Sequence, residues 1–112
     1  MPRDATVFLD DIIEACEKIN RYISGLTVEQ FRLDEKTIDA VVRNLEVIGE
    51  AAKNVPDETR ATIAVDWKRM AGLRDVLIHE YFGIDLDIIW DVVQTKVPEL
   101  HRHVSLHLGK PD

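Results

Sequence analysis

Apolar residues recur every three to four positions along most of this chain. That spacing places them on one face of an α-helix, whereas a half-buried strand would need alternation at every second position. No segment shows convincing alternation. We therefore expect an all-α fold, an up-and-down helical bundle of four to five helices. The long helices are predicted over about 6–24, 34–55, 66–82 and 85–97, with shorter helical pieces at 27–31, 57–64 and 99–108.

Residues that start and stop helices stand at the matching places. Asp34 precedes the second long helix and has the short acidic side chain that suits an N-cap. The sequence TVEQ, residues 27–30, is typical of a capping box. Gly25 follows the first helix and suits a C-terminal cap. Pro98 has no amide hydrogen to donate, so it is predicted to break or kink the fourth helix.

Two glycines stand inside helical patterns, Gly49 in the second long helix and Gly72 in the third. Each costs about 1 kcal/mol relative to alanine in a helix interior. A close crossing of the two helices would offset that cost, because glycine lets backbones approach. We therefore predict that these helices cross at the two glycines and that the contact holds the third helix rigidly.

Size and composition predict one domain that spans residues 1–112. A chain of 112 residues has room for a single core, and 46% hydrophobic with 31% charged residues is ordinary for a soluble globule. No apolar run approaches the roughly 18 residues of a membrane span, and the first residues, MPRDATVF, lack the apolar region of a signal peptide. We expect a cytoplasmic protein without membrane contact. The single cysteine, Cys16, lies on an apolar helix face and is interpreted as a buried bystander.

The formal net charge of −7 argues against a general nucleic-acid binder, because such proteins carry a broad basic footprint. Any contact with RNA must therefore be local. Alternatively, an acidic surface of this kind could match a basic protein partner.

The stretch RDVLIHEY, residues 74–81, combines a fixed cation, a histidine and a phenol. Arginine keeps its proton and its planar fork suits phosphate oxygens, whereas histidine can give or take a proton near neutral pH. Cleavage of a phosphodiester without a metal needs those two capacities. Judged by composition alone, such a segment more often contains a surface arginine and a histidine with a purely structural role in the helix.

Helix geometry separates these side chains. Arg74 and Tyr81 are seven residues apart and share one face, whereas Asp75 and His79 are four apart and share another. Arg74 and His79 diverge by roughly 140° around a regular helix, too far to converge easily on one phosphate within one subunit. Either the helix loosens before Gly83, or two copies of the motif meet across a twofold axis.

The segment resembles the R-x4-H-x-Y signature of the HEPN superfamily, in its HepT-like toxin branch. The similarity also covers residues 8–31, 41–56 and 66–93, in the order that the family has them. The resemblance implies a HEPN-like bundle that forms a homodimer, with a composite site in the dimer cleft. It further implies the toxin of a toxin–antitoxin system, an endoribonuclease that acts on RNA.

The residue roles follow from this resemblance. His79 would be the general base for the ribose 2′-hydroxyl or the general acid for the leaving oxygen, and Arg74 would neutralise charge on the phosphate. Asp75 is placed to accept a hydrogen bond from the imidazole. This chemistry needs no metal or other cofactor and leaves a 2′,3′-cyclic phosphate. Tyr81 matches the tyrosine to which a nucleotidyltransferase antitoxin transfers AMP.

The sequence patterns that would indicate a metal site are incomplete. His79 and Glu80 begin like the zinc-protease pattern H-E-x-x-H, but Gly83 occupies the position of the second histidine. The tail carries three further histidines, which we interpret as exposed residues because too few ligands accompany them. They are His101, His103 and His107.

A second hypothesis from a different class stays open. The chain could be a noncatalytic helical partner subunit that binds a nucleotidyltransferase, with the motif residues stabilising the interface. The acidic surface favours this alternative slightly, and intact Arg74, His79 and Tyr81 favour the toxin.

Overall fold

The computed structural model describes residues 4–79 and 85–109, apart from the side chains of residues 74–76, 78 and 79. Every regular element in these ranges is helical, so the predicted all-α class is confirmed. None of the described helices is both long enough and apolar enough to cross a membrane. The elements are α1 (Ala5–Ile23), α2 (Val28–Leu33), α3 (Glu35–Asn54), α4 (Asp57–Arg60), α5 (Trp67–His79), α6 (Leu86–Asp91), the π-helix η2 (Val92–Lys96) and α7 (Val97–His107).

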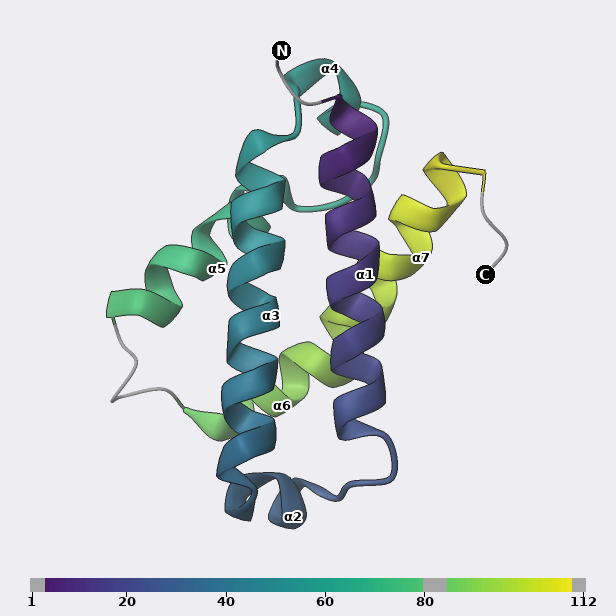
Figure 1. Cartoon of the computed structure of the whole chain (residues 1–112). Helices are drawn as coiled ribbons and strands as arrows, with labels where there is room; N and C mark the ends of the chain where they lie inside the picture. The colour runs from purple at the N-terminus through teal and green to yellow at the C-terminus, as the bar shows by residue number, and fades with distance from the viewer. Residues whose placement is uncertain (1–3, 80–84, 110–112) are drawn as a thin grey trace.

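The two longest helices, α1 and α3, run antiparallel and form the centre of the bundle (Figure 1). α5 packs on α3 and α7 packs on α1, and in Figure 1 α5 extends to the left of the central pair and α7 to the right. The short helix α2 connects α1 to α3 at one end of the bundle, and α4 lies at the other end. The arrangement is the expected helical bundle, and α2 and α4 lie where short helical pieces were predicted.

One continuous apolar core joins the helices. Its fully buried members come mainly from the facing stripes of α1 and α3, which recur at the spacing of a helix turn. Phe31 of α2 closes one end and its ring lies 5.1 Å from that of Trp90 on α6. The largest fully buried apolar side chains are Leu9, Ile12, Ile19, Phe31, Val41, Leu45, Ile48 and Val104.

The predicted caps are confirmed. The Asp34 side chain accepts a hydrogen bond from the Thr37 amide at 3.0 Å and another from its hydroxyl at 2.7 Å. Thr27 and Gln30 form the reciprocal capping box, with distances of 3.2 and 2.9 Å. Gly25 has a φ of 81°, a left-handed conformation that a residue with a Cβ adopts at a cost. Local hydrogen bonding therefore decides where these helices begin and end.

The end of α3 depends on a contact that sequence reasoning did not find. The Arg60 guanidinium, at the end of α4, donates to the Ala52 carbonyl at 2.9 Å and to the Lys53 carbonyl at 3.0 Å. The last carbonyls of a helix have no partner within it, and a cation at this end also meets the negative end of the helix dipole. Arg60 thus caps α3 from outside and fixes the turn that leads towards α5.

Pro98 neither ends the helix nor leaves it regular. It lies in the first turn of α7, directly after η2, and the Val97 amide donates to the Val92 carbonyl five residues back. A wider π turn re-routes the hydrogen bonds just before a residue that cannot donate one. The helix type changes here and α6 and α7 run in different directions (Figure 1), so of the two predicted outcomes the structure shows the kink and not the break.

Cys16 is buried on α1, with 2% of its surface exposed, as the sequence predicted. Burial raises the pKa of its thiol to about 12, and the nearby negative charge of Glu17 acts in the same direction. The thiolate is the nucleophilic form, so this residue stays protonated and unreactive at neutral pH.

Candidate functional site

The motif residues Arg74, Asp75 and His79 lie on α5, a helix that ends at His79 within the described residues. Their side chains are outside the part of the chain that the structure describes, as is the whole of Tyr81. The roles assigned to these four residues therefore stay predictions. The helix that carries the first three is described, together with the contacts that hold it.

α5 is anchored at its beginning by two neighbouring residues. The Asp66 carboxylate accepts a hydrogen bond from the Arg69 amide at 3.1 Å, which satisfies one of the free amides of the first turn. The Trp67 indole donates to the carbonyls of Arg60 and Ile63, at 3.1 and 3.3 Å. Trp67 thus ties the start of α5 to the same residue that caps α3.

The face of α5 that packs on α3 is marked by three buried side chains, those of Trp67, Met70 and Leu77. Arg74 stands four residues after Met70 and three before Leu77, so its position falls on the same stripe. His79 stands seven residues after Gly72 and eleven after the exposed Lys68, on the stripe nearly opposite. The backbone of α5 is helical throughout, so it retains the divergence that the sequence predicted.

The predicted close crossing at the two glycines is wrong for Gly72. A Cβ built at this position would meet nothing within 4 Å. Gly72 instead lies in an open groove on α5 beside Lys68, Arg69 and Leu73. α3 and α5 do pack together, and Gly49 is buried on α3, but Gly72 is on the side of α5 that no other described element covers.

Two of the tail histidines differ from the exposed state that we predicted. The His101 Nε2 lies 3.6 Å from a carboxylate oxygen of Glu17 on α1, and its side chain is 29% exposed. The His103 Nε2 lies 3.8 Å from Glu99, and its side chain is 23% exposed. His107 is exposed as expected. The pair between His101 and Glu17 joins residues 84 positions apart, and no local sequence pattern signals such a contact.

Within the part of the chain whose side chains are described, no three histidine, cysteine, aspartate or glutamate residues gather as a metal site requires. His101 and His103 each have one carboxylate beside them, so each pair would offer a metal two ligands, whereas a bound zinc ion commonly has three or four protein ligands.

Comparison with known proteins places the chain in a family. The family described as "Ribonuclease HepT-like" matches residues 12–106. A protein of Methanocaldococcus jannaschii named "Putative RNase MJ0127" is 50% identical over 100 residues, covering 88% of this chain and 83% of the relative. The "Probable ribonuclease HepT" of Thermococcus cleftensis is 43% identical over 101 residues, covering 89% of this chain and 92% of the relative.

A third relative, from Caldanaerobacter subterraneus and named "Putative RNase TTE0752", is 43% identical over 104 residues, covering 92% of this chain and 93% of the relative. No solved structure matches the chain. The family match spans α3, α5 and most of α1 and α7, and the relatives cover nearly the whole length. The chain belongs to the HepT-like ribonuclease family of the HEPN superfamily.

Proposed function

We propose that this protein is the toxin of a toxin–antitoxin system and acts as a metal-independent endoribonuclease. The observation that carries the proposal is the family match over residues 12–106, which includes the complete motif of Arg74, His79 and Tyr81. The acidic balance of the chain fits this proposal only if contact with RNA is confined to a small site.

In the proposed reaction His79 removes the proton of the ribose 2′-hydroxyl, and that oxygen attacks the adjacent phosphorus. A second histidine protonates the 5′-oxygen as its bond to phosphorus breaks, leaving a 2′,3′-cyclic phosphate and a free 5′-hydroxyl. Arg74 stabilises the negative charge that grows on the phosphate oxygens. Asp75 accepts a hydrogen bond from the imidazole and holds it in one tautomer. A strand without the 2′-hydroxyl cannot react, so DNA is not cleaved.

The site is proposed to be composite and to require a homodimer. Arg74 and His79 stand on stripes of α5 roughly 140° apart, so one helix does not readily bring both to one phosphate. In a symmetric dimer, His79 of one subunit can approach Arg74 of the other, and two histidines become available as acid and base. The open groove at Gly72 supports an interface here, because it leaves room for a second helix to approach α5.

Control of the toxin is proposed to act at Tyr81. A nucleotidyltransferase antitoxin would transfer AMP to the phenol, adding bulk and negative charge on the helix face that Tyr81 is predicted to share with Arg74. Intact mass measured after incubation with the antitoxin and ATP should rise by one AMP. A Tyr81→Phe variant should fold and resist modification. If AMP is still added to the Phe variant, or none is added to the parent while toxicity is lost, inhibition comes from another site or from binding alone.

The activity is tested by cleavage of a mixed single-stranded RNA with purified protein, with and without chelator. His79→Ala and Arg74→Ala should each lose most of the activity, at least about a hundredfold for a general acid–base residue. His107→Ala and Arg102→Ala remove the same types of side chain from exposed positions and should cleave like the parent. Products should end in a 2′,3′-cyclic phosphate.

Expression of the chain alone in a bacterial host separates this proposal from its alternative. Growth should stop with the parent and continue with Arg74→Ala. Cleavage that needs an added metal would contradict the mechanism. Absence of both growth arrest and cleavage would favour the noncatalytic partner subunit.

A further inference from the structure

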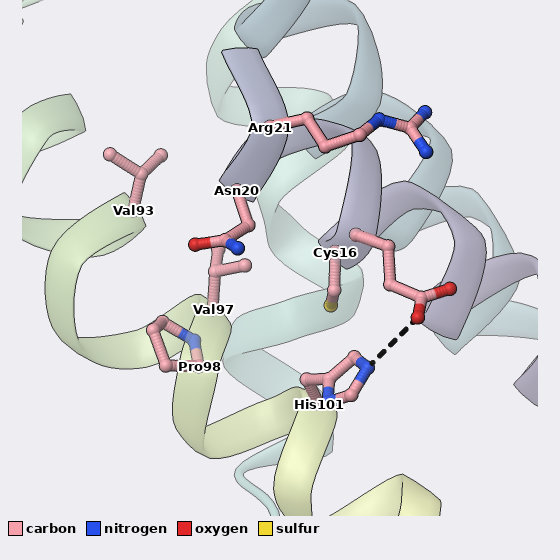
Figure 2. Close-up of a pocket in the computed structure, with 8 residues that line it drawn as sticks. Cys16, Asn20, Arg21, Val93, Val97, Pro98 and His101 are labelled. Carbon is pink, nitrogen blue, oxygen red and sulfur yellow. Dashed lines mark ion pairs between the residues drawn. The ribbon is translucent and has the colours of Figure 1, made fainter. Parts of the chain in front are cut away.

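A cavity of about 480 Å³ opens between α1 and the segment formed by η2 and α7 (Figure 2). It lies on the α7 side of the bundle, and α5 lies on the other side of the central helices (Figure 1). Its volume falls within the range of small-molecule pockets in proteins. The proposed cleavage chemistry does not use it, so its lining requires a separate explanation.

The floor of the cavity is apolar and uncharged. Val93 and Val97 are buried and present their side chains from the helix around η2, with the ring of Pro98 beside them. The Cys16 thiol faces them from α1 and stays protonated, as its raised pKa requires. The π-helix contributes Val93 to this wall, and π segments recur at functional sites. Such a floor suits the faces of a flat ring.

The rim carries hydrogen-bonding groups of three kinds. The carboxylate of Glu17 is held by His101 through one oxygen, Oε2. The Asn20 side chain extends over Val97 and offers an amide that both donates and accepts (Figure 2). Arg21 is exposed, and neither its side chain nor that of Asn20 has a hydrogen bond or ion pair with another residue of the described part. The rim thus offers a fixed cation, a free amide and a free carboxylate oxygen.

We propose that this cavity binds one nucleotide with an amino-bearing base, either within single-stranded RNA or as a free nucleotide. The base lies on the floor between Cys16 and Pro98. Asn20 and Glu17 bind the base edge, because an amide pairs with adenine and a carboxylate accepts from the amino group of cytosine. The phosphate binds the planar fork of Arg21. Uracil has no amino group and would leave the second oxygen of Glu17, Oε1, without a donor.

A nucleotide fits this lining better than a simple anion or an apolar ligand. A simple anion would find one fixed cation, Arg21, and would be repelled by Glu17, with which His101 is already paired. An apolar ligand would leave the Asn20 amide unpaired. An RNA strand held here would gain affinity and base preference at a point separate from α5. A local site of this kind is also what a chain of net charge −7 needs in order to hold RNA.

The RNA form of the proposal rests on the proposed ribonuclease function, so binding is measured apart from cleavage. Full-length protein with His79→Ala is titrated with fluorescent ten-nucleotide oligo(A), oligo(C) and oligo(U), and with 5′-AMP, 5′-CMP and 5′-UMP by calorimetry. Oligo(A) and oligo(C) should bind tighter than oligo(U) by on the order of tenfold. The mononucleotides show whether a free nucleotide suffices.

Three variants assign the binding to the cavity. Asn20→Trp fills the cavity from an exposed position and should weaken the binding of oligo(A) by on the order of tenfold. Asn54→Trp, an exposed control on α3, should leave that binding unchanged. Arg21→Ala should weaken all oligonucleotides alike, and more than the exposed control Arg102→Ala, which removes the same charge. Circular dichroism confirms that each variant keeps its helical content.

The outcomes separate the two proposals. If the Asn20→Trp protein binds every probe as tightly as its parent does, the nucleotide site is overturned. This holds whether or not the protein with intact His79 cleaves RNA. Binding that depends on Asn20 together with an absence of cleavage overturns the ribonuclease and leaves the site. If mononucleotide binding depends on Asn20 and oligonucleotides do not bind, then the ligand is a free nucleotide.

Discussion

α3 and α5 pack against each other, yet they differ in how much of the molecule holds them. α3 packs against α1 as well as α5, begins at the Asp34 cap and ends at carbonyls bound by Arg60. α5 begins at the Asp66 cap and packs chiefly on α3, leaving the side that contains Gly72 open. The helix at the centre packs on two long neighbours and is capped at both ends, and the helix with the motif has one long neighbour and an open side.

The same contrast holds for polar residues on the buried stripes. On α3 the polar residue that reaches the core is Asn44, which is 8% exposed and donates to the Ala40 carbonyl of its own helix at 2.9 Å. On α5 the corresponding stripe carries an arginine between Met70 and Leu77. A small amide satisfies itself locally, whereas an arginine at this sequence position departs from the apolar pattern of a packing helix. Departures of this kind tend to mark function.

Removal of buried apolar groups should produce the largest effect and should differ between the two helices. Leu45 on α3 is fully buried, and Leu77 on α5 is 2% exposed. We expect Leu45→Ala to lower the free energy of unfolding by about 4 kcal/mol and Leu77→Ala by about 2.5 kcal/mol, because α5 can relax towards its open side. Urea denaturation measures both. Equal losses would contradict the view that α5 is held less firmly.

Loss of the external cap on α3 should come next. Arg60→Ala leaves the Ala52 and Lys53 carbonyls without their donor and should cost about 2 kcal/mol. The exposed control Arg102→Ala should change the unfolding free energy little. Arg60→Lys keeps the charge and should recover only part of the loss, since an ammonium lacks the planar fork. Full recovery would show that the charge alone stabilises the helix end.

Substitution of Gly72 and of Gly25 by alanine should change the free energy of unfolding in opposite directions. Gly72→Ala should stabilise the monomer by about 1 kcal/mol, because a Cβ there meets nothing and alanine favours the helix. Gly25→Ala should destabilise by about 1 kcal/mol, because its φ of 81° strains a residue with a Cβ. Thermal unfolding measures both effects.

Sedimentation of the same Gly72 variant sharpens the comparison further. If the open side of α5 receives a second copy closely, then Gly72→Ala should shift the monomer–dimer equilibrium towards monomer while it stabilises the helix. A dimer of unchanged affinity would place the interface elsewhere.

The smallest effect concerns acid pH at the start of α3. Hydrogen bonds from Thr37 lower the pKa of Asp34, with a smaller contribution from the charge of Lys36. A lowered folded pKa means that the stabilisation is present above the ordinary aspartate pKa of about 3.9 and is lost as pH falls through the folded value. The urea midpoints of the parent and Asp34→Ala proteins should therefore converge between pH 5 and pH 2. A constant difference would contradict this linkage.

Sequence reasoning predicted the fold class and the helix boundaries well because these depend on near neighbours. Asp34 reaches Thr37 three residues on, and Thr27 reaches Gln30 over the same distance. It left open whether Pro98 breaks or kinks the helix and did not predict the π turn, because that choice depends on packing around η2. For the candidate site, it identified the motif residues, whose roles stay predictions, and missed the cavity beside Cys16.

By itself, the sequence determined that this chain is helical, where most helices start and stop, and that Cys16 is buried. Each of these properties follows from apolar periodicity or from hydrogen bonds within one turn of helix. Tertiary structure alone decided that Arg60 caps α3, that His101 meets Glu17 and that one side of α5 stays open. The last two depend on how whole helices pack across the bundle, and the Arg60 contact depends on how the turn after α3 folds back onto it. Local pattern does not encode any of them.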